Sequence, residues 1–438
     1  MSRFGIRKSG RAGLRAALLT GATVAALAVG GLGAGSASAA VLCNGGNIIG
    51  EGSSLQKISQ QNVWIPAFQT EVCNFGTLPK IEYKPEGSGA GLKAWGANGG
   101  AIDRTRAFIG TDDAPTAAQI ANIKAAAGGE NTHVLVIPVA QTAIAPVINP
   151  PAGCTVENLT NKELEKSFRG IILKWSELEN AVGGAACESP LTRVVRFDGS
   201  GTTFQFKNYL GLANTASLPC IEQTWKQLEP IENATTGAPN TSWPESCKKV
   251  LSPVVRPAAK GGGEEVKKVN ATPGSIGYAA LPDAEANGGT VVGVQNNGFV
   301  ATEEATYGNP QIAGASAGKG VANCAATKYT VPVEGRRTGT GIDVDWSQVF
   351  GALPAIGGSA YPLCTLTYDL AFKGYKEAGF KFAPYQTVRD FLNGYVVFGG
   401  QTALITSETN YAPLPETPGL AGNNVIAAAK FSAALISQ

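Results

Sequence analysis

The chain has 438 residues, of which 44% are hydrophobic and 16% are charged, and its formal net charge at pH 7 is +2. This near-neutral charge argues against a nucleic-acid partner, because nucleic acids require a basic binding face. The only histidine, His133, stands at the start of an apolar stretch, and no G-x-S-x-G elbow or C-x-x-C pair occurs. We therefore expect a structural histidine, no catalytic triad, no metal site and no cofactor.

The first 40 residues are typical of a secretory signal peptide. Arginine and lysine residues precede an apolar run over residues 16–35, and Ala37-Ser38-Ala39 fits a cleavage site. No later stretch is apolar enough over a sufficient length to span a bilayer. We expect an exported mature chain that begins near Ala40 or Val41 and has room for two or three domains.

All eight cysteines follow the predicted cleavage site, and an even number in an exported chain indicates disulfides. Eight cysteines allow 105 pairings. We predict pairing between nearest neighbours: Cys43–Cys73, Cys154–Cys187, Cys220–Cys247 and Cys324–Cys364.

Three strand–turn–helix units open the mature chain. The first is "NIIGEGSSL" with a helix through Trp64 and Phe68, the second has a strand at residues 81–83 and a turn at 87–91, and the third is "AFIGTDDAPTAAQI". Repeated units of this kind predict an α/β fold whose sheets are covered on both faces.

The later elements continue this pattern. "HVLVIPVAQTAIAPVINP" predicts a pair of apolar strands, and Thr160 with Glu163 forms a capping box at a helix start. Residues 283–343 are rich in glycine, alanine, threonine and asparagine and predict loops and short strands. "AYPLCTLTYDLAF" is again typical of a strand, and the remainder is mainly helical.

Three turns share one chemistry, because each places small and hydroxyl residues at a helix start: residues 52–54, 87–91 and 198–202. Unpaired N–H groups and the helix dipole attract anions at such places. Each turn alone could equally be a structural N-cap. Nucleotide motifs are only partly matched: Gly89-x-Gly91-x-x-Ala94 lacks its acidic partner, and the "GASAGKG" stretch is one residue short of a P-loop.

In combination these motifs resemble the periplasmic phosphate-binding proteins of the phosphate ABC importer. The resemblance runs in order through "GEGSSL", "EGSGAGLKAW", "FIGTDDAPT", "LTNKELEKSFRGIILKWSEL", "VVRFDGSGTTFQFKNYL" and "ATPGSIGYAAL". It implies an α/β fold of two lobes joined by crossover strands, with the ligand cleft between them. The implied boundaries are a signal peptide at 1–40, lobe 1 at 41–133 and 361–438, and lobe 2 at 134–360 with an expanded region at 283–343.

The resemblance also implies a ligand set. The phosphate contacts would be Ser54, Leu55, Ser88, Asp113, Arg196, Ser200, Gly201 and Thr202, with Asp198 holding Arg196 in place. The chain departs from the family where Leu55-Gln56-Lys57 follow the first turn, and where Asp112 adds a second carboxylate of unknown direction.

The implied function is a non-enzymatic receptor, acting as a monomer, that captures inorganic phosphate and delivers it to a membrane ABC permease. The alternatives are a receptor for another oxyanion such as sulfate, a secreted phosphatase, and a wall protein that has lost binding. Leu42 before Cys43 is a poor lipidation signal, and lipidating Cys43 would leave an odd cysteine count. We therefore expect a periplasmic or extracellular protein without a lipid anchor.

Overall fold

A computed structural model describes residues 41–73, 79–214, 225, 243, 251–298, 304–316, 319–351, 356–416 and 424–437. All of these residues belong to one compact unit. The predicted signal peptide and the predicted Cys220–Cys247 pair lie outside the described residues. None of the helices in the described part of the chain is long and apolar enough to cross a membrane.

Most strands join one mixed sheet with the order β2-β1-β3-β14-β4-β8-β6-β7, and β9 and β15 also pair with β4. The strands of this sheet are β1 (Ile48–Gly52), β2 (Ile81–Lys84), β3 (Phe108–Thr111), β4 (Val134–Asn149), β6 (Thr192–Val194), β7 (Val254–Val255), β8 (Ser275–Ala280), β9 (Thr290–Val291), β14 (Cys364–Phe372) and β15 (Tyr411–Ala412). Strands β1, β2 and β3 are mutually parallel, as strand–turn–helix units require. Their carboxyl ends therefore meet at one edge.

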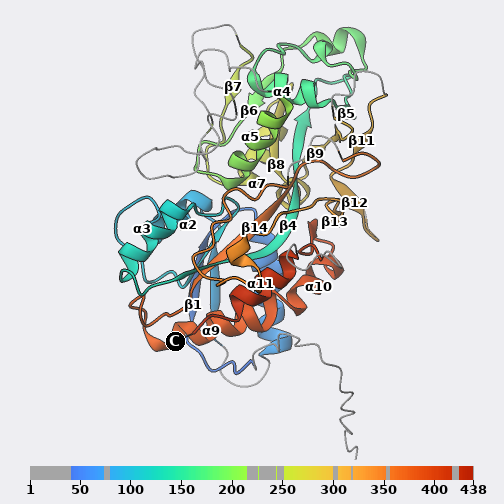
Figure 1. Ribbon diagram of the computed structural model, residues 1–438. Helices are drawn as coiled ribbons and strands as arrows, with labels where there is room; N and C mark the ends of the chain where they lie inside the picture. The colour runs from blue at the N-terminus through green and yellow to red at the C-terminus, as the bar shows by residue number, and fades with distance from the viewer. Residues whose placement is uncertain are drawn as a thin grey trace, which may run out of the picture. The chain divides into compact units, whose positions relative to one another are not determined.

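The stretch expected to form two strands is one continuous strand, β4, so that prediction was wrong. Residues Val134–Ala143 pair with β14, whereas Ile144–Asn149 pair with β8 (Figure 1). The strand continues because a different neighbour supplies hydrogen bonds along each part. Pro138 lies at the shift of register between β4 and β14, where its missing N–H costs least. Strand β4 thus links two regions of the sheet.

Two large hydrophobic clusters and one small one lie along β4. The large clusters include the strand residues from Val134 to Ala140 and those from Ala143 to Ala145 with Ile148, and the small cluster includes Val147. This arrangement agrees with the predicted α/β class of two lobes, which is confirmed. The predicted lobe boundaries at 133 and 361 remain a prediction.

Helices cover the sheet, and one of them, α4 (Asn161–Arg169), begins at the predicted capping box. They are η1 (Ser59–Trp64), α1 (Ile65–Ala67), η2 (Phe68–Val72), α2 (Ser88–Ala94), α3 (Ala117–Ala127), α4 (Asn161–Arg169), η3 (Trp175–Glu177), η4 (Gly184–Glu188), α5 (Gly201–Ala213), α7 (Gly262–Asn270), α8 (Leu281–Ala286), α9 (Phe382–Phe391), η6 (Leu392–Val396), α10 (Gly399–Thr406) and α11 (Val425–Ala433). The capping box at the start of α4 is present, since Thr160 Oγ1 accepts from Glu163 N and the Glu163 carboxylate accepts from Thr160 N. Local chemistry therefore determines where this helix begins.

Three of the four predicted disulfides are confirmed: Cys43–Cys73, Cys154–Cys187 and Cys324–Cys364. Each closes a loop of 30 to 40 residues in sequence separation. Cross-links of this kind stabilise a fold chiefly by restricting the unfolded chain.

The region between residues 283 and 343 contains short strands rather than long elements. Strand β10 (Gly293–Gln295) pairs with β11 (Tyr307–Gly308) on one side and with β5 (Asn158–Leu159) on the other. Strands β12 (Gln311–Ala313) and β13 (Gly320–Ala322) form a second small sheet. The helical turn η5 (Val333–Gly335) follows. The side chain of His133 contacts the end of this region, where its Nδ1 lies 2.8 Å from Asp343 Oδ2.

We expect Asp369→Asn to raise the free energy of unfolding more at pH 8 than at pH 5. Asp369 is fully buried on β14, and burial raises its pKa to about 7, although hydrogen bonds from Gln60 and Gln56 oppose the shift. A carboxyl with a raised folded pKa stabilises the fold below its unfolded pKa, and this stability is lost as the pH rises through 7. The gain at pH 8 should exceed the gain at pH 5 by about 2–3 kcal/mol, at about 1.4 kcal/mol per pKa unit.

Chemical denaturation at both pH values measures this difference. Asp103→Asn serves as the control with the opposite sign. Burial is the largest single effect on Asp103 and raises its pKa, but the hydrogen bonds from Thr105 and the charges of Arg106 and Lys84 together lower the pKa. That variant should lose stability at pH 8. An equal gain by Asp369→Asn at both pH values would contradict the prediction.

Candidate functional site

The three predicted turns meet around the side chain of Asp112. Ser53 Oγ from the first turn donates to Asp112 Oδ1 at 2.5 Å, and Ser88 Oγ from the second donates to Oδ2 at 3.4 Å. Thr202 Oγ1, in the first turn of α5, also donates to Oδ2 at 3.4 Å, and Thr367 Oγ1 from β14 donates to Oδ1 at 2.9 Å. We call the hydroxyls of Ser53, Ser88, Thr202 and Thr367 the hydroxyl cluster.

The sheet explains why these turns converge. Ser53 follows β1, Ser88 follows β2 and Asp112 follows β3, so all three lie beyond the carboxyl ends of parallel strands. Ligand sites of α/β sheets form at this edge. Backbone hydrogen bonds tie the turns together: Gly87 N donates to Gly52 O at 2.8 Å, and Gly89 N donates to Gly199 O at 3.3 Å.

Arg196 and Asp198 form a buried ion pair after β6. The guanidinium is 1% exposed, and it donates from Nε to Asp198 Oδ1 at 2.6 Å and from Nη2 to Oδ2. Burial by itself lowers the pKa of Arg196, but the hydrogen bonds and charge of Asp198 outweigh burial and raise it. Arg196 is therefore a permanent positive charge of defined orientation.

The start of α5 combines capping with a close backbone approach. Ser200 is the N-cap, and its Oγ accepts from Thr203 N at 3.2 Å, which leaves its O–H free to donate elsewhere. A side chain at Gly201 would place its Cβ 2.6 Å from Asp113 Oδ1 and 2.7 Å from Asp113 N. Only glycine fits at this position, because the start of α5 packs directly against the Asp-Asp turn.

Asp113 is fully buried beside Asp112. Its Oδ1 accepts from Thr111 Oγ1 at 3.0 Å, and its Oδ2 has no hydrogen-bond partner among the described residues. Burial and the neighbouring Asp112 carboxylate raise the pKa of Asp113 to about 7. Asp113 can therefore gain or lose a proton near neutral pH.

Ser54 and Leu55, also predicted as ligands, lie on another side of the first turn. Ser54 Oγ accepts from Gly262 N at 3.3 Å and lines a pocket of about 260 Å³ together with Lys57 and the start of α7. Leu55 is 1% exposed, and its carbonyl accepts from the Tyr411 hydroxyl. Neither residue contacts Asp112 through a described hydrogen bond.

Several residues of the site were not predicted. Ser53 of the first turn donates to Asp112, and Asp112 lies where the three turns meet. Thr367 stands 255 positions after Asp112, and no local motif marks it. Two further buried carboxyls, Glu265 and Asp283, interact electrostatically with Arg196. Burial raises the pKa of both, that of Asp283 to about 7, and the charge of Arg196 acts in the opposite direction.

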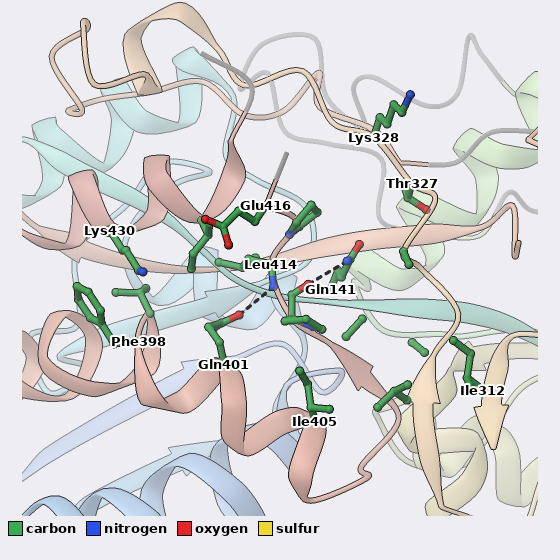
Figure 2. Close-up of a pocket in the computed structure, with 18 residues that line it drawn as sticks. Gln141, Ile312, Thr327, Lys328, Phe398, Gln401, Ile405, Leu414, Glu416 and Lys430 are labelled. Carbon is green, nitrogen blue, oxygen red and sulfur yellow. Dashed lines mark hydrogen bonds between the residues drawn. The ribbon is translucent and has the colours of Figure 1, made fainter. Parts of the chain in front are cut away.

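A second pocket, of about 650 Å³, lies elsewhere in the molecule (Figure 2). Its described lining is largely apolar and contains none of the predicted ligand residues. Its amides are bonded within the chain, since Gln401 Oε1 accepts from Leu414 N and Gln141 Nε2 donates to Pro413 O, both at 2.9 Å. Lys430 lies 4.5 Å from the centre of the Phe398 ring. These contacts do not form a convergent set of anion donors.

The whole chain is similar to known phosphate-binding proteins. Phosphate-binding protein PstS 3 of Mycobacterium leprae is 26% identical over 396 residues, which cover 89% of each chain. The crystal structure of an ancestral soluble variant of the human phosphate-binding protein matches with a TM-score of 0.57 and 20% identity, covering 89% of this chain and 93% of that one. The phosphate-bound structure of the periplasmic PfluDING protein matches with a TM-score of 0.54 and 20% identity, covering 84% and 91%.

The structural matches bear out the two-lobed α/β fold expected from the sequence. A family model described as the PBP superfamily domain matches residues 37–330, which is more than half of the chain. The resemblance stated from the sequence motifs is thereby confirmed. The chain belongs to the PBP superfamily.

Proposed function

We propose that this protein is an exported receptor that binds inorganic phosphate and delivers it to an ABC-type importer. The relative from Mycobacterium leprae is named as a phosphate-binding protein, and the PfluDING structure contains phosphate. The proposed ligand contacts are Ser54, Leu55, Ser88, Asp113, Arg196, Ser200, Gly201 and Thr202, with Asp198 as the support of Arg196.

One observation carries this proposal: a buried, oriented guanidinium interacts electrostatically with Asp112, around which hydroxyl donors from separate turns gather. Arg196 is held by Asp198, and α5 begins three residues after Asp198. A phosphate oxyanion needs several donors of this kind, and charge-assisted hydrogen bonds contribute about 1.5–3 kcal/mol each. The start of α5 adds the partial positive charge of its dipole.

Asp113 supports phosphate over sulfate as the ligand. At neutral pH phosphate still carries a proton and sulfate carries none. A buried carboxylate oxygen without a protein donor can accept the phosphate proton, whereas it meets only lone pairs on sulfate. The direct test is calorimetric titration of the mature protein with both anions, together with a phosphomonoester assay for the phosphatase alternative.

We also propose that the protein acts as a periplasmic or extracellular monomer without a lipid anchor and without enzymatic activity. Cys43, the only cysteine near the predicted cleavage site, is paired with Cys73. A lipid on Cys43 would break that disulfide. Mass spectrometry of the protein secreted by an expressing cell tests this part of the proposal.

We expect Arg196→Ala to abolish phosphate binding at micromolar concentrations while the protein remains folded. Removing one partner of a buried ion pair costs about 3–5 kcal/mol, which is about two to nearly four decades in affinity. It also leaves Asp198 as an uncompensated negative charge beside the ligand. Calorimetry with phosphate measures the loss.

Arg193→Ala provides the matched control. Arg193 is also buried, on β6 three residues before Arg196, but it donates to the carbonyl oxygens of Phe168 and Ser252. That variant loses a buried arginine without losing a proposed ligand contact, so it should still bind phosphate. Binding by Arg196→Ala close to that of the wild type would show that the Arg196 turn is purely structural.

We expect Asp113→Asn to narrow the preference for phosphate over sulfate. The amide removes the negative charge and offers an N–H to a fully deprotonated anion. Competition titrations of wild type and variant with both anions measure the preference. Asp369→Asn, which neutralises another buried carboxyl, should keep the wild-type preference.

The phosphate assignment fails if sulfate displaces phosphate from the wild-type protein at comparable concentrations. In that case the protein would be a receptor for oxyanions more broadly, sulfate included. If Asp113→Asn keeps the wild-type preference for phosphate over sulfate, Asp113 does not contribute to the proposed selectivity.

A further inference from the structure

The carboxylate of Asp112 is surrounded as an oxyanion ligand would be. It is 2% exposed, and all four members of the hydroxyl cluster donate to it, two to each oxygen. These donors come from four separate segments: the turns after β1 and β2, the start of α5, and β14. The backbone of Asp112 is held as well, since its N–H donates to Ser88 Oγ at 3.1 Å and its carbonyl accepts from Gln205 Nε2 at 3.1 Å.

Two of these donors are also proposed phosphate contacts. Ser88 and Thr202 each carry a single hydroxyl hydrogen, and both hydroxyl oxygens lie 3.4 Å from Asp112 Oδ2, the acceptor they share. The Ser88 hydroxyl also interacts with the carboxylate of Asp113. A hydroxyl cannot donate the same hydrogen fully to two acceptors. Phosphate can therefore take these two donors only when Asp112 releases them.

The charges around Asp112 favour protonation of its carboxylate, and a protonated carboxyl would release the hydroxyl donors. Burial raises the pKa of Asp112, while the hydroxyl cluster and Arg196 partly offset this effect. An incoming phosphate anion adds further negative charge, which raises the pKa again. The titratable and charged groups that face Asp112 are Arg196, Asp113, Asp283, Tyr83 and Tyr411. Arg196 is the only permanent cation among them, so protonation is the simplest way to admit a second anion.

We propose that Asp112 is an internal competitor of the ligand, whose carboxylate occupies the hydroxyl donors of the anion site until it is protonated or displaced. This inference rests on the proposed function. It makes Asp112 a residue that sets affinity and couples binding to pH: phosphate binding takes up a proton at Asp112 and weakens as the pH rises. The receptor would accordingly load phosphate best in acidic surroundings.

The test is calorimetric titration of wild type and Asp112→Asn with inorganic phosphate between pH 5.5 and pH 8.5. Asparagine has the same size, carries no charge and cannot take up the proton. We expect it to tighten phosphate binding by about tenfold or more at pH 8.5, the equivalent of one charge-assisted hydrogen bond, and by much less at pH 5.5. Titrations in buffers of different ionisation enthalpy should show that the variant takes up fewer protons than the wild type.

Asp283→Asn is the matched control, because Asp283 is a buried carboxyl that also interacts with Arg196 but receives no hydrogen bond from the hydroxyl cluster. An equal tightening by both variants would overturn the proposal, since a general charge effect would explain it. Unchanged or weaker binding by Asp112→Asn would also overturn it, while phosphate binding by the wild type would leave the proposed function intact. If Asp112→Asn does not fold, Asp112→Ser replaces it.

Two outcomes separate this inference from the function on which it rests. Binding of phosphate by Asp112→Asn but not by the wild type would support the competition in its strongest form. Absence of phosphate binding by the wild type and by both folded variants at every pH would reject the proposed function and the inference together.

Discussion

Arg196 is almost completely buried, and it remains charged there because Asp198 holds it through two hydrogen bonds. A buried charge without such a partner would be neutralised or expelled, so the pair is a condition for everything built around it. Asp112, Glu265 and Asp283 all lie within its electrostatic reach. The guanidinium thus partly offsets the cost of burying these carboxyls.

Several buried carboxyls surround this guanidinium. Burial raises the pKa of Asp113 and Asp283 to about 7, and it raises that of Asp112 as well. Each carboxyl that stays neutral can donate a hydrogen bond or release a donor to a neighbour, and each that ionises competes with an anionic ligand. A site of this composition is well suited to distinguish ligands by the protons they carry.

The fold could be predicted from sequence wherever the signal was local. The strand–turn–helix units around β1, β2 and β3 were predicted from hydrophobic runs and glycine-rich turns, and the start of α4 from Thr160 and Glu163. The continuity of β4 could not be predicted from sequence, because its two prolines suggest a break. The strand is continuous because β14 pairs with its first part and β8 with its second part. Similarly, Ser200 has the N-cap role that its position indicates, yet the contact of Gly201 with Asp113 depends on two distant segments.

The sequence by itself determined the family and the three anion-type turns, because these depend on local motifs. The family resemblance also implied that Asp198 holds Arg196, and the structure contains this pair. Only the tertiary structure decided which of two adjacent aspartates takes the hydroxyls of Ser88 and Thr202. Neighbouring side chains on an extended segment point in different directions, and their sequence is compatible with either assignment. The position of Asp112 is fixed where α5, and Thr367 on β14, pack against the end of β3. These contacts join segments that are far apart in the chain.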